Sequence, residues 1–315
     1  MPIYGLKMRY LQAKHILKRY SMLFKAYNLI IESDFDLKLP EVKGENPDIY
    51  FRKGEFSIEN YKKTKIFRAG IQARVGLTEK EYFINWPEVC TFLAHNGKYI
   101  EYVKLQNNDD FFRLFAVSEA LGLILQQQGF FLLHGSAVKI GNKATIFIGP
   151  PGAGKSTTVA AFAKAGYTVL SDDLTAIRID ENGIPSVMPA YPEVKIWQKS
   201  VVNLEIEMLS LEPSFEGNTK FLFRQNPELF PQIAVELSEI IILQKPYSKK
   251  KSEIPLVHIP IELLKYYPLP HQILQNESLK RHFDNALKIG RQVSVRRMNR
   301  PKNFEKLLTF VRNFE

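Results

Sequence analysis

Cysteine is nearly absent from this chain, since Cys90 is the only one among 315 residues. A single cysteine excludes an internal disulfide, which fits a reducing compartment, and we expect a cytoplasmic protein. The surrounding residues 87–93 are mostly apolar, which predicts a small buried side chain at Cys90 and not a nucleophile.

Long apolar runs are also missing. No stretch of about 18 apolar residues occurs, and no signal-peptide pattern opens the chain, so we expect neither a membrane span nor secretion. The net charge is +10, yet zinc-finger spacing, an RNA-binding aromatic signature and a helix-turn-helix are all absent. We therefore expect no nucleic-acid partner and interpret the basic clusters at 1–31, 249–251 and 291–300 as solvated, with an acidic partner as the alternative.

The most informative segment that is present is 144–166. An apolar, β-branched run at 144–148 predicts a buried strand, and 156–165 predicts a helix that ends at Gly166. Between them lies G-x-x-x-x-G-K-[ST], the Walker A phosphate-binding loop (P-loop), which predicts ATP and Mg²⁺. Lys155 is expected to reach the β- and γ-phosphates and Ser156 to bind Mg²⁺. The residues predicted to bind the nucleotide are Gly149, Pro150, Pro151, Gly152, Ala153, Gly154, Lys155, Ser156 and Thr157.

A hairpin is predicted immediately before this loop, because a Gly141-Asn142 turn separates the apolar runs 130–140 and 144–148. Alternation puts His134, Ser136 and Val138 on one face of its first strand. A core position is the ordinary interpretation of His134, but its strand neighbours the one that ends at the phosphate loop.

The next predicted strand, 167–174, ends in two adjacent carboxylates, Asp172 and Asp173. If parallel strands flank the loop, their carboxyl ends meet at one edge of the sheet, which would bring both aspartates near Ser156. One carboxylate could then hold Mg²⁺ and the other accept a proton from an attacking hydroxyl. The alternative is an Asp-Asp pair that only caps a turn or helix.

The length fits two domains. The first half reads as β-rich, with strands predicted at 26–33, 48–52, 65–67 and 82–84, and an amide-rich and acidic cap at 107–110 predicts a helix over 111–128. We therefore expect a basic segment at 1–27, a β-rich domain at 28–108 and the loop-containing domain at 109–315.

The order of these motifs resembles the kinase domain of HPr kinase/phosphorylase, a family that phosphorylates a protein serine and whose fold is similar to ATP-dependent phosphoenolpyruvate carboxykinases. The motifs are Leu133-His-Gly-Ser-Ala-Val, the phosphate loop and Val169-Leu-Ser-Asp-Asp. The whole layout is similar to the HPr-kinase-like proteins encoded with lasso-peptide and related peptide-maturation genes, in the helix around 114–123, the segment 190–197 and the stretch 293–301. The resemblance implies an α/β P-loop kinase domain preceded by a smaller β-rich domain.

By this resemblance Asp172 is the general base, Asp173 the metal-side carboxylate, and His134 hydrogen-bonds within the same group. Lys195 and Lys220 are candidates for phosphate or substrate contacts, with ordinary surface lysines as the alternative. The Glu-x-Arg-Gly signature of true HPr kinases is missing, which argues against HPr as the substrate. HPr kinases assemble into hexamers but have a different first domain, so a homo-oligomer is left open here.

Three functions remain. The favoured one is an ATP-dependent serine kinase that acts on a peptide or protein; the second is a small-molecule kinase, for example of free serine. The third is a nucleotide-switched regulatory ATPase with no phosphorylated product. The strand at 239–243 ends in Gln244 and not in the Asp-Glu pair of motor ATPases, and no arginine-finger motif is evident, which disfavours the third.

Overall fold

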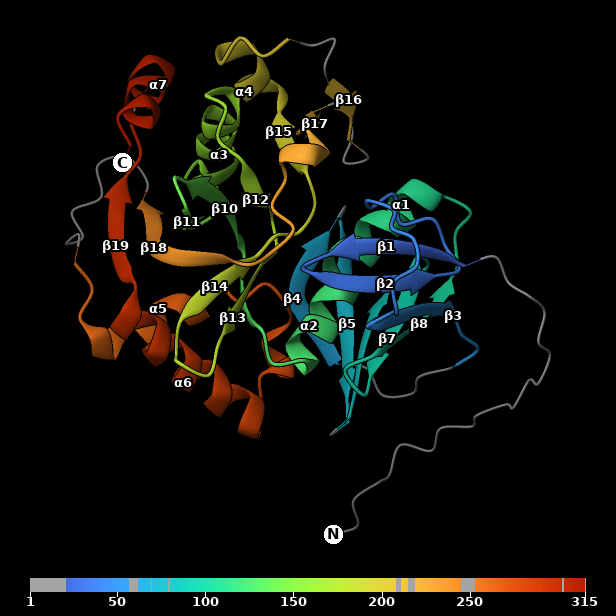
Figure 1. The fold of residues 1–315 in the computed structure, drawn as a ribbon. Helices are drawn as coiled ribbons and strands as arrows, with labels where there is room; N and C mark the ends of the chain where they lie inside the picture. Colours follow the sequence, from blue (N-terminus) through green and yellow to red (C-terminus); the bar gives the residue numbers. More distant parts are fainter. Residues whose placement is uncertain are drawn as a thin grey trace. The chain divides into compact units, whose positions relative to one another are not determined.

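The computed structural model has a mixed α/β fold and describes residues 21–56, 62–68, 70–78, 80–207, 211–214, 219–244, 253–301 and 303–314 (Figure 1). Of the basic opening segment, residues 1–20 lie outside this range. Two compact units are present. The first comprises residues 21–25, 29–128 and 269–273, and the second comprises 26–28, 129–268 and 274 onward. No helix among the described residues is both long and apolar enough to cross a membrane.

The first unit is built on an eight-stranded sheet in the order β1-β2-β3-β8-β7-β6-β5-β4. The strands are β1 (Met22–Ala26), β2 (Leu29–Ser33), β3 (Ile49–Lys53), β4 (Lys62–Arg68), β5 (Ile71–Leu77), β6 (Glu81–Trp86), β7 (Cys90–His95) and β8 (Tyr99–Lys104). The single strand predicted at 26–33 is wrong. Tyr27 and Asn28 have φ of 55° and 57°, the left-handed conformation of a tight hairpin turn, so the segment divides between β1 and β2.

A helical segment follows the sheet, as α1 (Asp109–Phe115), a π-helical turn (Ala116–Ala120) and α2 (Leu121–Gln127). Asn108 caps it by accepting from the Phe111 N–H, and Gly129 ends it with φ of 85°. Phe112 packs on the sheet, with its ring centroid 5.4 Å from that of Phe92 and 5.0 Å from that of Tyr102. These contacts group the helical segment with the first unit, so the compact units change at 128/129, whereas the sequence suggested 108/109.

The second unit contains a sheet in the order β12-β10-β11-β18-β14-β13-β9, and β19 pairs with β18. The strands are β9 (Phe131–Leu133), β10 (Gly135–Ile140), β11 (Lys143–Ile148), β12 (Val169–Ser171), β13 (Thr175–Ile179), β14 (Pro185–Met188), β18 (Val235–Gln244) and β19 (Ser294–Asn299). The predicted hairpin around Gly141 is confirmed as β10 and β11, which pair antiparallel from Gly135↔Ile148 to Ile140↔Lys143.

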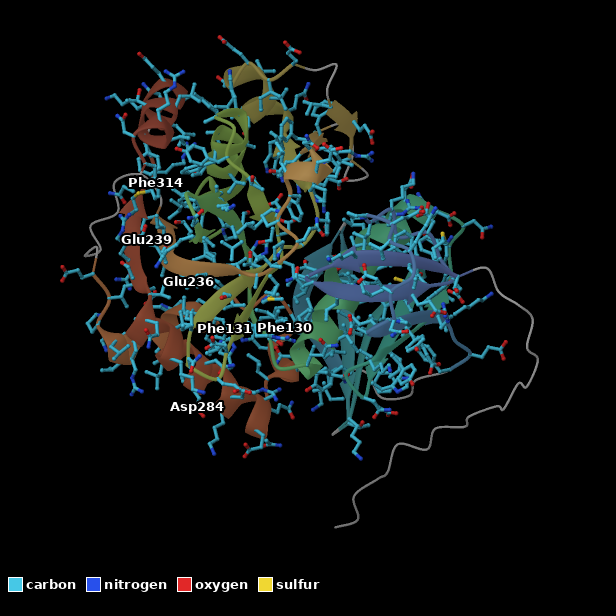
Figure 2. The ribbon with its side chains drawn as sticks, in the orientation of Figure 1. Phe130, Phe131, Glu236, Glu239, Asp284 and Phe314 are labelled. Carbon is cyan, nitrogen blue, oxygen red and sulfur yellow. The ribbon has the colours of Figure 1, made fainter. Side chains whose placement is uncertain are left out.

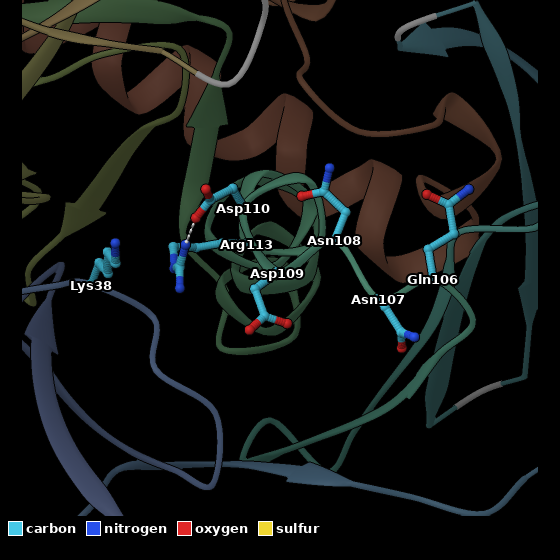
Figure 3. A pocket seen from close by; sticks show the side chains of 7 residues that line it. All are labelled: Lys38, Gln106, Asn107, Asn108, Asp109, Asp110 and Arg113. Carbon is cyan, nitrogen blue, oxygen red and sulfur yellow. Dashed lines mark hydrogen bonds and ion pairs between the residues drawn. The ribbon is translucent and has the colours of Figure 1, made fainter.

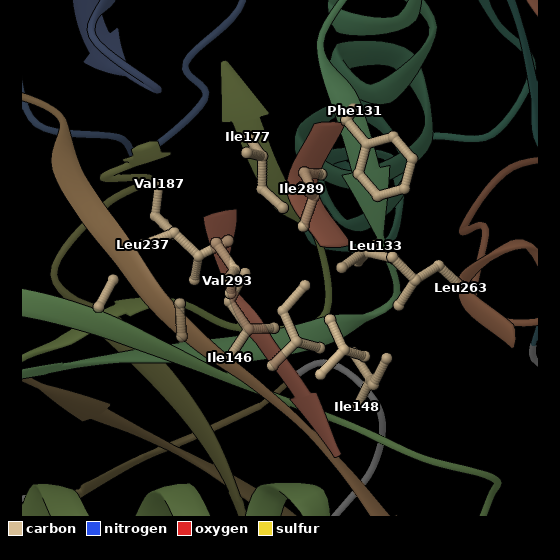
Figure 4. Close-up of a cluster of buried hydrophobic side chains, with 14 of the residues drawn as sticks. Phe131, Leu133, Ile146, Ile148, Ile177, Val187, Leu237, Leu263, Ile289 and Val293 are labelled. Atoms are coloured by element: carbon tan, nitrogen blue, oxygen red, sulfur yellow. The ribbon is translucent and has the colours of Figure 1, made fainter. Parts of the chain in front are cut away.

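Helices cover both faces of this sheet. They are α3 (Lys155–Lys164), α4 (Gln198–Asn203), α5 (Ile259–Leu264), α6 (Asn276–Gln292) and α7 (Phe304–Arg312). Alternation along β11 divides the core. Ile146 and Ile148 pack with residues of α5 and α6 (Figure 4). Phe147, between them, packs with residues of α3 and α7. Phe314, just after α7, closes the second cluster against Phe162, with 5.4 Å between the ring centroids (Figure 2). A separate three-stranded sheet, β15-β17-β16, consists of β15 (Glu193–Trp197), β16 (Leu211–Pro213) and β17 (Lys220–Arg224).

Candidate functional site

The predicted phosphate loop connects β11 to α3, as the sequence pattern requires. We call residues 149–154 the glycine loop. Gly149 lies so close to β18 that a Cβ on it would be 2.6 Å from the Leu243 carbonyl oxygen, so only glycine fits. Lys155 begins α3, and its Nζ donates a 2.8 Å hydrogen bond back across the loop to the Gly149 carbonyl oxygen. The loop therefore surrounds the amino end of α3, where backbone N–H groups favour anions.

Strand direction brings the glycine loop and the aspartate pair to one edge of the sheet. β11 is parallel to β18 and β18 to β19, whereas β10 is antiparallel to both β11 and β12. β12 consequently runs in the same direction as β11, and both carboxyl ends lie at the same edge. The two strands are not neighbours, because β10 lies between them, a difference from the parallel flanking strands expected from the sequence.

The Asp172 carboxylate is fixed by two hydrogen bonds. Oδ1 accepts from the Ser136 hydroxyl at 2.6 Å, and Oδ2 accepts from the Lys195 backbone N–H at 3.0 Å. Burial, together with the negative charge of Asp173, raises the pKa of Asp172 to about 6. The two hydrogen bonds hold the carboxylate in one orientation.

Asp173 occupies a strained backbone position next to this carboxylate. Its φ is 63°, which a non-glycine residue adopts only when its surroundings enforce it. Its Oδ2 lies 3.6 Å from Nζ of Lys195, and its carbonyl oxygen lies 3.0 Å from Nδ1 of His134. Such strain often marks functional sites.

His134 is close to the aspartates, as expected, and its Nδ1 lies within hydrogen-bond distance of the Asp173 carbonyl oxygen, but the continuous strand predicted around it is wrong. The strand predicted at 130–140 breaks at this residue, because β9 ends at Leu133 and β10 begins at Gly135. The His134 N–H donates to the Tyr266 carbonyl oxygen, outside the β10–β11 ladder. His134 is therefore exposed, whereas Ser136 and Val138 are buried, so the three do not share one face.

Charges across the site act on Lys155. Burial lowers the pKa of Lys155, and the charges of Asp173 and Asp172 partly oppose this shift. Ser156 lies in the first turn of α3, and the next residue, Thr157, shares a 3.0 Å hydrogen bond with the Ser200 hydroxyl. Lys155 and the two carboxylates thus lie near one another at the edge that bears the glycine loop, and Ser156 follows Lys155 in the first turn of α3.

The donor set fits Mg²⁺ better than a metal held by protein side chains alone. Among the described residues, no group of three or more His, Cys, Asp or Glu side chains could hold an ion. Mg²⁺ in phosphate sites uses one or two carboxylates together with phosphate oxygens and water, so the pair expected from the sequence, Ser156 and Asp173, would need no third protein side chain.

The two candidate lysines have different surroundings. Lys195, on β15, contacts both aspartates through its backbone N–H and its Nζ. Lys220, on β17, lies with its Nζ 4.7 Å from the centroid of the Trp197 ring. Ser136 is a residue that the sequence did not single out as functional; strand alternation placed it beside Val138 but gave no sign of its bond to Asp172.

The first unit contains a polar cavity of about 790 Å³ (Figure 3). It is lined by Lys38 and residues 106–110 and 113. Its charges are largely satisfied internally, since Asp110 pairs with Arg113 and Asp109 with Lys104. It contains none of the predicted site residues.

No family model matches the chain, and no curated protein matches its sequence. One similar solved structure is that of the HPr(Ser) kinase/phosphatase from Coxiella burnetii, with 20% identity over 38% of this chain and 69% of that chain and a TM-score of 0.25. A likeness of this degree supports no conclusion on activity. The chemistry is therefore inferred from the residues of the site.

Proposed function

We propose that this protein is an ATP-dependent kinase that transfers the γ-phosphate to a serine hydroxyl of a peptide or protein. The observation that supports it most is the aspartate pair at the sheet edge of the glycine loop, with Asp172 held by Ser136 and by the Lys195 backbone. Phosphoryl transfer needs positioning and charge neutralisation more than covalent chemistry. A fixed carboxylate beside a phosphate loop supplies the first of these for an acceptor hydroxyl.

Each residue then has a defined task. The glycine loop binds phosphate oxygens through its N–H groups, and Lys155 turns from the Gly149 carbonyl toward the same oxygens. Asp172 accepts the proton of the acceptor hydroxyl as it attacks. Lys195 keeps both carboxylates in place, and His134 fixes the Asp173 backbone. Bound Mg²⁺, held by Ser156 and Asp173, would neutralise charge on the transferred group.

The acceptor class rests on the sequence resemblance to HPr-kinase-like proteins of peptide-maturation gene clusters. Free serine or a similar metabolite would use the same transfer chemistry, so the two acceptors are separated only by experiment. A regulatory ATPase would need no base for an acceptor hydroxyl, although a carboxylate that orients water would serve it.

Mass spectrometry tests the proposal directly. The purified full chain is incubated with ATP, Mg²⁺ and, separately, free serine, HPr and any precursor peptide encoded beside the gene. We expect one added phosphate on a peptide serine, at least about 10²-fold slower in Asp172→Asn while ATP still binds. Asp284→Asn, which changes an exposed aspartate on α6, is the matched control (Figure 2).

The other outcomes are equally informative. Phosphorylated free serine with unmodified peptides would establish a small-molecule kinase instead. ATP hydrolysis that is unaffected by any acceptor would favour the regulatory ATPase. Full transfer activity in Asp172→Asn would show that Asp172 is not the general base.

A further inference from the structure

The carboxyl end of β19 brings a second cation to the glycine loop. Arg300 follows β19 directly, and its side chain packs on Gly154, the residue before Lys155. A Cβ on Gly154 would lie 2.6 Å from Cδ and 2.7 Å from Nε of Arg300. Pro301 comes next, and the residue before a proline is restricted to extended conformations. Arg300 is therefore held against the loop by its backbone and by close packing.

The surroundings of this guanidinium favour an anion. Gly154 is the N-cap of α3, so Arg300 lies at the positive end of the helix dipole, beside Lys155. Its neighbours on β19 are neutralised, since Arg296 pairs with Glu239 and Arg297 with Glu262. Among the residues that the structure describes, no carboxylate pairs with Arg300, and burial lowers its pKa. A half-buried cation at this position is stabilised when an anion binds.

The strand order indicates which part of a nucleotide lies there. From β11, the sheet continues through β10 to β12 and Asp172 on one side, and through β18 to β19 and Arg300 on the other. The transferred phosphate must face Asp172 if that residue is the base. The remaining phosphates and the nucleoside then extend toward the β19 side.

We infer that the Arg300 guanidinium binds the phosphates of ATP that are not transferred, and therefore binds ADP and ATP alike. This inference rests on the proposed function and adds a nucleotide-binding residue to it. Because these phosphates are present in both ATP and ADP, Arg300 contributes to the affinity for both nucleotides.

Calorimetric titration of the full chain with ADP and with a non-hydrolysable ATP analogue, each with Mg²⁺, tests this without turnover. We expect Arg300→Gln to weaken the binding of both nucleotides about tenfold or more, because a charge-assisted contact to phosphate is lost. Arg300→Lys should recover part of this affinity. Arg291→Ala, which removes the same charge from an exposed position before β19, should bind as the unmodified chain does.

Two results would overturn the inference while leaving the kinase proposal intact: unchanged affinities in Arg300→Gln, or weakened ATP-analogue binding with unchanged ADP binding, which would move the contact to the γ-phosphate. If Arg300→Gln does not fold, Arg300→Lys alone tests the inference. We then expect it to weaken the binding of both nucleotides measurably, and unchanged affinities would contradict the inference. An unmodified chain that binds neither nucleotide would overturn the kinase proposal itself.

Discussion

The Ser136 hydroxyl donates a 2.6 Å hydrogen bond to Oδ1 of Asp172, and both residues are covered from solvent to a large extent. The bond joins β10 to the end of β12 and leaves the carboxylate little freedom to rotate. Its geometry makes Ser136 a positioning residue for the proposed base.

Ser136→Ala should therefore slow transfer about tenfold and leave ATP affinity nearly unchanged, because one bond to a charged group is lost and the nucleotide contacts remain. Steady-state kinetics that separate kcat from KM measure this. Ser238→Ala is the control, since its hydroxyl donates to the Ala144 carbonyl oxygen elsewhere in the same sheet. Equal rates in the two variants would show that the Ser136 bond does not position the base.

Lys155→Ala should weaken ATP binding at least tenfold and slow transfer further, since the lost charge faces both the bound phosphates and the charge that develops during transfer. Equilibrium binding and rates are both measured. Lys143→Ala, which removes an exposed lysine paired with Glu236 on the same sheet, should change neither. Unchanged values in Lys155→Ala would mean that the glycine loop does not bind phosphates.

Gly149→Ala should reduce the free energy of unfolding by more than about 2 kcal/mol, because the added Cβ would lie 2.6 Å from the Leu243 carbonyl oxygen. Gly141→Ala is the control: its φ is 56°, but nothing lies within 4 Å of the added Cβ, so only the strain of about 1 kcal/mol applies. Urea unfolding followed by circular dichroism compares them. Equal losses would show that the Leu243 contact relaxes at little cost.

Cys90 should resist alkylation in the folded protein. The side chain is fully buried, and burial with the charge of Glu119 raises the pKa of its thiol, so both access and thiolate are lacking. Iodoacetamide at pH 8 should modify one thiol per chain only after unfolding in urea, as counted by mass spectrometry. Rapid labelling of the native chain would show that the first unit opens locally.

Local sequence signals were sufficient for the elements around the glycine loop. β11 and α3 are marked by an unbroken apolar run and by glycines at both ends of the loop, and the β10–β11 turn by Gly141. The turn at Tyr27 was missed because neither central residue is glycine. When tertiary packing enforces a positive φ, the residue types in the turn do not predict it.

The contacts within the site could not be predicted in the same way. Asp172 is 36 residues from Ser136 and 23 from Lys195 along the chain. These pairs depend on which strand lies between β11 and β12, and hydrophobic periodicity does not predict the order of strands in a sheet. The sequence supplied the residue types for the chemistry, whereas the antiparallel β10 between two codirectional strands supplies their arrangement.

The hairpin turn at Tyr27 bears on how this protein could be divided. Residues 26–28 belong to the second unit although the strands on either side are grouped with the first. The Tyr27 ring is 2% exposed, and its hydroxyl donates to the carbonyl oxygen of Leu174, the residue after the aspartate pair. A fragment starting at Gly129 would lack this ring and its hydrogen bond to Leu174, so no single cleavage point yields the second unit intact.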